Sequence, residues 1–192
     1  MFNSKIIFIG AEKTSLKYIK QIIDSLPNHF DFSILICIPY IQTMNINFIN
    51  YFSKDSHHII KHPEHDEFLE NGKIYIAPPS AHTFISNNET FHLSREYTKF
   101  YTQPSIDLCL LSFTEYYKEN LTAIIFPGNT KDGFFGVKKL KSCNGNIFIH
   151  NNTDFKTICD CKCFSEIVGS DNCYEIDQII NVIAKTNQYA EY

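Results

Sequence analysis

The sequence lacks the features that would place it at a membrane or on nucleic acid. No apolar stretch approaches the roughly 18 residues of a membrane-spanning helix, and Ile6–Ala11 is too short for a signal peptide. The 192 residues carry 17 basic and 21 acidic side chains, with no basic stripe interleaved with aromatics. We therefore expect a cytoplasmic protein that neither inserts into a membrane nor binds nucleic acid.

An ordered disulfide framework is also missing. The seven cysteines are odd in number and irregularly spaced, which favours reduced thiols. Apolar residues make up 44% and aromatics 15% of the chain, which is typical of a globular protein. With no repeat and no linker, we expect residues 1–192 to form one domain.

Short apolar runs alternate with amphipathic stretches along the chain. The runs expected as strands are Ile6–Ile9, Phe32–Ile38, Lys73–Ala77, Thr122–Phe126 and Asn146–Ile149. The stretches expected as helices are Leu16–Leu26, Asn45–Phe52, Ile106–Glu119, Gly133–Lys141 and Ile176–Ala184. A hairpin is expected from Thr83–Ile85 and Thr90–Leu93. This order predicts an α/β fold with one doubly wound, mostly parallel, Rossmann-like sheet and helices on both faces.

The most informative stretch is Leu121–Gly136. An apolar run ends at Pro127-Gly128, and Asp132-Gly133 then opens a helix-like segment. In a parallel sheet such a loop lies at the carboxyl edge of the strands, where ligands and reacting groups gather. The run that ends in Gly10 has the same shape.

Several segments, in this order, resemble the catalytic domain of the chemotaxis protein-glutamate methylesterases (CheB). The Gly72–Pro78 segment, followed by His82, is similar to the family's Gly-x-x-Tyr-Ile-Ala-Pro segment and its histidine. Gln103–Asp107 resembles the family's Arg-Pro-Ser-Val-Asp segment, and Gly128–Gly133 resembles its aspartate loop. The resemblance covers nearly the whole chain and implies a methylesterase-like fold without the family's receiver domain.

The resemblance also implies a Ser-His-Asp triad, and this chain departs from it at two positions. The serine position is occupied by Glu12, and the histidine position falls on Ile38, or on Pro39 after a shift of one residue. Thr14-Ser15 replaces the glycine pair that follows the serine. Of the three triad positions, only that of the aspartate carries the family's residue, which is Asp132 here. Without an attacking group and its base, acyl transfer from an ester has no obvious route.

We therefore expect a chemotaxis or two-component-type protein that resembles a hydrolase but is a pseudoenzyme acting as a binding or regulatory module. Asp132 is its retained catalytic position, and the substrate-binding candidates are Gly10, Gly128, Gly133 and His82. The resemblance implies chemoreceptors or other signalling proteins as partners and no cofactor. The oligomeric state stays open.

Two other functions stay open. One is an active ester hydrolase, a methylesterase or deamidase, in which Cys37 or Ser15 is the nucleophile, with His82 and Asp132 as possible supporting groups. The other is a small-molecule sensor that uses the crevice at the strand ends, which rests on fold analogy alone.

Two clusters contain residues of the types that bind metals. The His57–His65 stretch holds four histidines, with His58 and His62 four apart, but Pro63 disfavours a helix there and a solvated loop is expected. The Cys159–Cys163 stretch spaces three thiols by two residues, with Cys173 as a nearby fourth, and is expected to form strand or loop. We expect no metal at either cluster.

Overall fold

The computed structural model describes residues 6–39, 47–96, 101–151 and 161–187. The strands are β1 (Ile6–Ala11), β2 (Ser33–Cys37), β3 (Ile59–Lys61), β4 (Lys73–Ile76), β5 (His82–Ile85), β6 (Phe91–Ser94), β7 (Leu121–Phe126), β8 (Asn146–His150) and β9 (Cys173–Tyr174). The α-helices are α1 (Leu16–Ser25), α2 (Phe48–Ser53), α3 (Ile106–Tyr117), α4 (Phe134–Ser142), α5 (Cys161–Val168) and α6 (Ile176–Asn187). Three 3-10 helices are η1 (Lys13–Ser15), η2 (Lys118–Asn120) and η3 (Ser170–Asn172).

A parallel sheet in the order β3-β4-β2-β1-β7-β8-β9 forms the centre of the molecule. The chain winds outward from β1 in both directions, and β5 and β6 form a separate antiparallel hairpin. This confirms the predicted doubly wound sheet, and it confirms the hairpin. Because all seven strands point the same way, their following loops meet at one edge.

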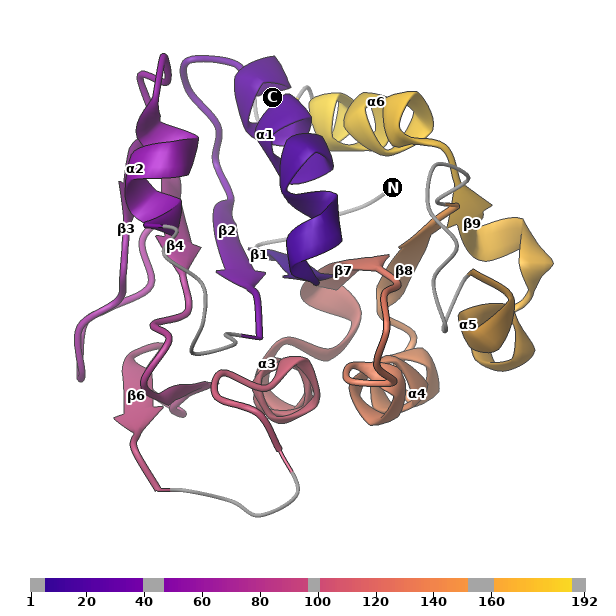
Figure 1. Ribbon diagram of the computed structural model, residues 1–192. Coiled ribbons are helices and arrows are strands. Elements are labelled where there is room, and N and C mark those ends of the chain that lie inside the picture. Colours follow the sequence, from indigo (N-terminus) through magenta and orange to yellow (C-terminus); the bar gives the residue numbers. More distant parts are fainter. Residues whose placement is uncertain (1–5, 40–46, 97–100, 152–160, 188–192) are drawn as a thin grey trace.

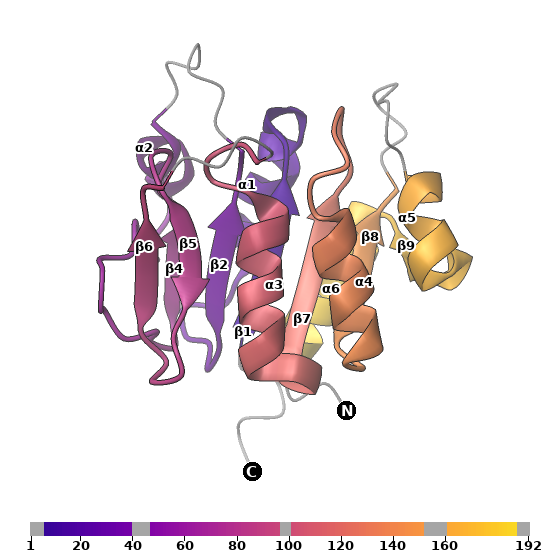
Figure 2. The same cartoon turned by 90° about the horizontal axis from the view of Figure 1, so that it is seen from below.

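Helices cover both faces of the sheet, as Figures 1 and 2 show: α1 and α6 lie on one face, and α3 and α4 on the other. The alternation of side chains along β1 explains the two layers. Ile7 and Ile9 pack in the core cluster that contains the buried face of α1, whereas Ile6 and Phe8 pack in the cluster that contains α3 and α4. All four side chains are at most 1% exposed, so β1 is buried on both sides.

The two edge strands were not predicted. β3 has three residues and pairs with β4, and β9 has two and pairs with β8. Strands this short carry no periodic pattern of their own, since hydrogen bonds to the neighbouring strand define them. The expected solvated loop at His57–His65 is therefore wrong at β3.

The cysteine-rich stretch also differs from its prediction. Cys161 and Cys163 lie on helix α5 and not on a strand or loop, while Cys159 lies outside the described residues. Phe164 and Val168, four residues apart on α5, are buried, as a helical stripe requires. Cys173 is disulfide-bonded, so the expectation of reduced thiols is wrong for this residue.

The start of helix α2 lies later than the predicted Asn45. α2 begins at Phe48, and the Asn47 side chain caps it by accepting from the Asn50 backbone N–H at 3.1 Å. Residues 45 and 46, where the prediction began, lie outside the described residues.

Candidate functional site

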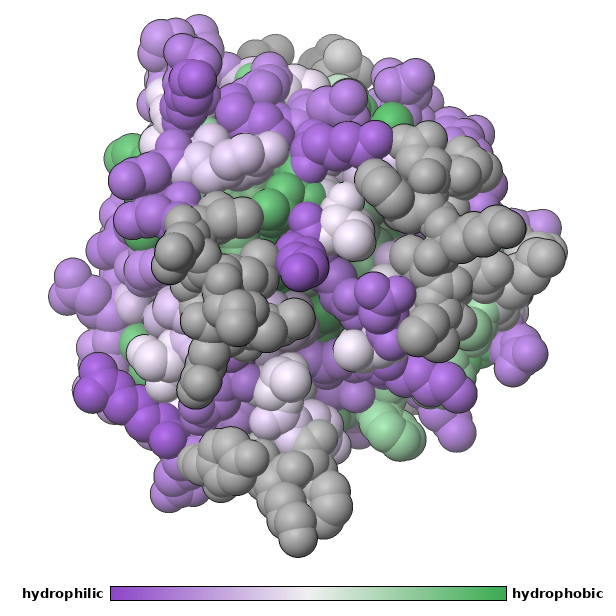
Figure 3. All heavy atoms as spheres, viewed as in Figure 1, coloured by the Kyte–Doolittle hydropathy of each residue, from purple (hydrophilic) through white to green (hydrophobic). Residues whose placement is uncertain are grey.

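The loops that follow β1 and β7 lie side by side at the carboxyl edge of the sheet. The two strands are neighbours in parallel register, with Ala11 opposite Phe126. The residue after Ala11 is Glu12, and the loop after Phe126 runs from Pro127 to Gly133. Figure 3 views this edge and shows hydrophilic side chains around a small hydrophobic area near the centre. The fold thus brings together the two loops that the sequence singled out.

Asp132 binds the first turn of helix α3. Its carboxylate accepts hydrogen bonds from the Ser105 hydroxyl at 3.0 Å and from the backbone N–H groups of Ile106 and Asp107 at 2.9 and 2.8 Å. The two backbone N–H groups are among those that a helix leaves unsatisfied at its amino end. Burial raises the pKa of Asp132, and the three donors oppose that rise. Asp132 therefore serves as a cap for α3.

Asp107 makes the equivalent contact with the next helix. Its Oδ1 accepts from the Gly136 backbone N–H in the first turn of α4 at 2.8 Å, and the side chain is buried. Burial raises the pKa of Asp107 to about 6, and the nearby charge of Asp132 adds to this effect. Asp107 lies in a segment that resembles the family's, but it was not predicted to be a site residue. The signal that was available is its position in the first turn of a helix, after Pro104-Ser105.

Glu12 connects the two loops. Its Oε1 accepts from the Thr130 backbone N–H at 2.8 Å and from the Thr130 hydroxyl at 2.9 Å. Gly128 makes room for this side chain, because a Cβ at Gly128 would lie 2.3 Å from Glu12 Cδ. The position that resembles the family's nucleophile therefore carries a carboxylate already bound to the neighbouring loop.

The predicted substrate-binding glycines are required by the packing of the protein itself. Gly133 has a φ of +100°, which side-chain-bearing residues rarely adopt, and a Cβ there would lie 2.9 Å from Ile106 Cγ2. A Cβ at Gly10 would lie 2.7 Å from the same atom. Contact of Gly10, Gly128 and Gly133 with a substrate stays a prediction.

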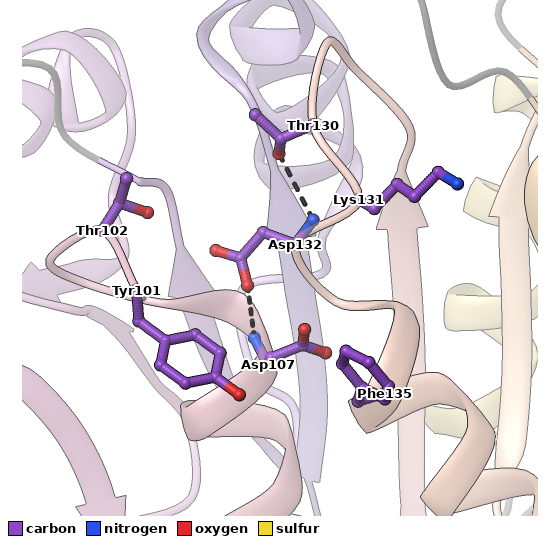
Figure 4. A pocket seen from close by; sticks show the side chains of 7 residues that line it. All are labelled: Tyr101, Thr102, Asp107, Thr130, Lys131, Asp132 and Phe135. Atoms are coloured by element: carbon purple, nitrogen blue, oxygen red, sulfur yellow. Dashed lines mark hydrogen bonds between the residues drawn. The ribbon is translucent and has the colours of Figure 1, made fainter. Parts of the chain in front are cut away.

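A cleft of about 400 Å³ opens beside these loops. Figure 4 shows its lining: the rings of Tyr101 and Phe135 lie on either side of Asp107, with Asp132 above it and Lys131 directed away. Phe135 is 62% exposed, so an apolar ring stands beside two carboxylates. The cleft is large enough for a side chain or a small ligand.

His82 is buried, at 2% exposure, and neither ring nitrogen has a hydrogen-bond partner among the residues that the structure describes. Burial lowers its pKa, and the charge of Asp132 opposes this. The fold thus places His82 within the electrostatic reach of Asp132 but not in hydrogen-bond contact with it. A buried ring without partners is unusual and calls for an explanation.

The two alternative nucleophiles lie inside the protein. Cys37 and Ser15 are both 0% exposed. Burial raises the pKa of the Cys37 thiol well above its ordinary value, and contact with Cys109 raises it further. The buried Ser15 hydroxyl has no hydrogen-bond partner within the described part of the chain. Ile38, at the expected histidine position, is buried at 2% exposure.

The histidines of the His57–His65 stretch have separate contacts. The Nδ1 of His62 lies 2.7 Å from the Ile76 carbonyl oxygen, and the Nδ1 of His65 accepts from the Leu93 backbone N–H at 3.1 Å. The ring of His58 packs edge-on against Phe30. Within the described ranges, no group of three or more His, Cys, Asp or Glu side chains is arranged to hold a metal ion. No helix among the same residues is both long and apolar enough to cross a bilayer.

The fold and this edge define a class, the doubly wound α/β domains with a site at the carboxyl ends of the strands. The CheB methylesterase family model matches residues 7–160. The chain therefore belongs to the CheB methylesterase family.

Known relatives agree with this assignment. A candidate protein-glutamate methylesterase/protein-glutamine glutaminase of Leptospira interrogans is 29% identical over 147 residues, which cover 77% of this chain and 76% of that protein. A protein-glutamate methylesterase/protein-glutamine glutaminase of Syntrophus aciditrophicus is 25% identical, over 80% of this chain and 44% of that protein. The crystal structure of the Thermotoga maritima CheB methylesterase catalytic domain superimposes with a TM-score of 0.84 at 23% identity, covering 95% of this chain and 98% of that one. That structure supports the predicted fold.

Proposed function

We propose that this domain does not catalyse ester hydrolysis and acts as a binding or regulatory module in a chemotaxis or two-component-type pathway. The observation that carries the proposal is the Glu12 carboxylate, bound to Thr130 at the position that resembles the family's nucleophile. The acid that would orient a histidine base, Asp132, is engaged with the start of α3. Signalling proteins such as chemoreceptors are the proposed partners, and the cytoplasm is the proposed location.

Neither an attacking group nor its base stands at the positions that resemble the family's serine and histidine, which Glu12 and Ile38 occupy. Loss of the serine or of the histidine of a hydrolase triad lowers turnover by a factor on the order of 10⁶. A carboxylate at position 12 would also oppose the negative charge that develops on the carbonyl oxygen in the transition state. Ile38 and Pro39 have no proton acceptor on their side chains.

Methanol release from a methylated chemoreceptor tests this proposal. The purified chain is incubated with the receptor, and an active family member serves as the positive control. We expect methanol at the level of the buffer blank. Methanol well above that blank, at a rate proportional to the concentration of this chain, would refute the absence of catalysis.

The binding role has a separate measurement. Calorimetric titration of the chain with a chemoreceptor signalling domain is expected to give saturable heat. The test variant is Phe135→Ala, which removes an exposed ring from the cleft wall and is expected to weaken binding. Equal heat from both proteins would show that the cleft is not the binding surface.

One observation favours a rewired hydrolase as the second candidate. The two ring nitrogens of His82 have no partner among the described residues and lie near the charge of Asp132, as expected of an unused base. The burial of Cys37 and Ser15 counts against it, because neither is exposed to a substrate. Selective labelling of either residue by a thiol- or hydroxyl-directed electrophile, lost in a His82→Ala variant, would support this candidate.

A further inference from the structure

Thr130 is engaged by a side chain from a distant part of the sequence. Its backbone N–H and its hydroxyl both donate to Glu12 Oε1, although the two residues are 118 positions apart. Hydrogen bonds from backbone N–H groups and hydroxyls to a carboxylate oxygen are shorter and stronger than bonds between neutral groups, and they are one way in which proteins bind carboxylates. The loop after β7 therefore presents a pair of donors that point at a single anion.

The backbone of the loop leaves space for the rest of the carboxylate. A Cβ added to Gly128 would lie 2.3 Å from Glu12 Cδ and 2.5 Å from Oε2. The carboxylate thus lies directly against the Gly128 backbone, where a side chain would displace it. Glu12 is half-buried, so solvent reaches this position from one side.

The contact of Glu12 is not what holds the neighbouring helices and strands in place. The start of α3 is capped by Asp132, and α4 is tied to α3 through Asp107 and Gly136. β1 and β7 are joined by their own parallel ladder up to Ala11 and Phe126. The Glu12 contact lies beyond the end of that ladder, where it joins the two loops and occupies the two donors of Thr130.

We propose that Gly128 and Thr130 form a carboxylate-binding site and that Glu12 is its built-in ligand, which keeps an external carboxylate out. The ligand class is an aliphatic carboxylate, such as the side chain of a partner's acidic residue. The inference rests on the proposed function for the location of the site, but it makes a claim about binding and none about esterase turnover.

Acetate is the probe that tests the site, because it replaces the methylene and carboxylate that a Glu12→Ala substitution removes. The backbone amide resonance of Thr130 is followed by NMR in ¹⁵N-labelled protein during titration with sodium acetate. In Glu12→Ala we expect a saturable shift of this resonance, at least about fivefold larger than in the parent chain, whose site is filled. Sodium chloride at equal ionic strength is expected to move neither resonance.

Two further variants make the result specific. Thr130→Val in the Glu12→Ala background removes one of the two donors and is expected to weaken acetate binding several-fold. Glu115→Ala removes an exposed carboxylate from α3 and is expected to leave the Thr130 resonance insensitive to acetate. Should Glu12→Ala fail to fold, Glu12→Ser removes the same carboxylate, keeps a hydroxyl at the γ position, and is expected to give a saturable acetate shift as well.

An unsaturable or absent acetate shift in the folded Glu12 variants would overturn the inference. An equal shift in the parent chain would also overturn it, because a filled site cannot bind a second carboxylate. Neither result alters the methanol measurement. Methanol release, in turn, would contradict the proposed function and leave the acetate titration as it stands.

Discussion

At the scale of single residues, the carboxylates at the strand-end edge serve as ligands for the protein's own donors. Asp132 binds the start of α3, Asp107 binds the start of α4, and Glu12 binds the loop after β7. Two of these three positions lie in segments that resemble the family's active site. Their hydrogen bonds lead to predictions about stability that are independent of catalysis.

Asp132→Ala is expected to lower the free energy of unfolding by about 2 kcal/mol, because three donors at the start of α3 lose their acceptor. Urea denaturation followed by circular dichroism measures this change. The control is Glu115→Ala, which removes an exposed carboxylate from the same helix. Equal stability of the two variants would show that Asp132 does not cap α3.

Asp107→Asn is expected to change how stability depends on pH. The pKa of Asp107 is raised from 3.8 to about 6 in the folded protein, so the folded state holds this proton more tightly than the unfolded state. Its contribution to stability is therefore greatest below about pH 4 and is lost as the pH rises to about 6. The asparagine keeps the oxygen that accepts from Gly136 and does not ionise.

The variant should therefore match the parent chain near pH 4 and exceed it above pH 6, by up to about 3 kcal/mol. Denaturation curves at half-unit pH steps measure the difference between the two proteins. Asp31→Asn, at an exposed position, is the control and should leave the profile unchanged. Parallel profiles for Asp107→Asn and the parent chain would contradict the raised pKa.

At the scale of elements, the close approach of α3 and α4 brings the two capping acids together. Gly136 is the contact point: a Cβ there would lie 2.8 Å from Leu110 Cβ and 2.9 Å from its Cγ. Both helices pack on the same face of the sheet, as Figure 2 shows. The absence of a side chain at Gly136 therefore lets α3 and α4 pack this closely.

Gly136→Ala is expected to destabilise the protein by about 1–3 kcal/mol, although alanine favours helix over glycine by about 1 kcal/mol. Thermal melting measures the loss. Adding Leu110→Ala removes the contacts of the new Cβ with Leu110 Cγ and Cδ2, both at 2.9 Å, but keeps the contact with Leu110 Cβ at 2.8 Å. The relief is partial, and the two changes should be less than additive. A stabilised Gly136→Ala variant would show that α3 and α4 separate freely.

At the scale of the whole molecule, the free thiols report on whether a buried nucleophile can reach solvent. Cys37 and Cys109 are 0% and 1% exposed, whereas Cys143 and Cys163 are partly exposed. We expect a disulfide reagent to label the second pair in the folded state and the first pair only on global unfolding. Mass-spectrometric mapping in increasing urea measures this order. Rapid labelling of Cys37 without denaturant would revive the hydrolase alternative.

The boundaries of the long elements follow closely from the sequence. β1, β2, β7 and α1 begin and end within about two residues of the predicted runs, because buried strands and an amphipathic helix leave strong local patterns. The edge strands β3 and β9 and the helix α5 were missed. The two edge strands are defined by hydrogen bonds to the neighbouring strands β4 and β8, which leave no pattern in the sequence of β3 or β9. Helix α5 was missed because the spacing of its cysteines by two residues suggested a strand.

The sequence by itself determined the order of strands and helices and the family, because both depend on residue identity or local periodicity. It also places Glu12 and Ile38 at the positions that resemble the family's serine and histidine. Only the tertiary structure decided what the remaining acids do. Glu12 and Thr130 lie 118 positions apart, and Asp132 and Ile106 lie 26 apart, so their hydrogen bonds leave no local pattern. The parallel strands bring their loops to one edge of the sheet. There, Glu12 accepts from Thr130 and joins two loops, and Asp132 accepts from Ile106 at the start of α3.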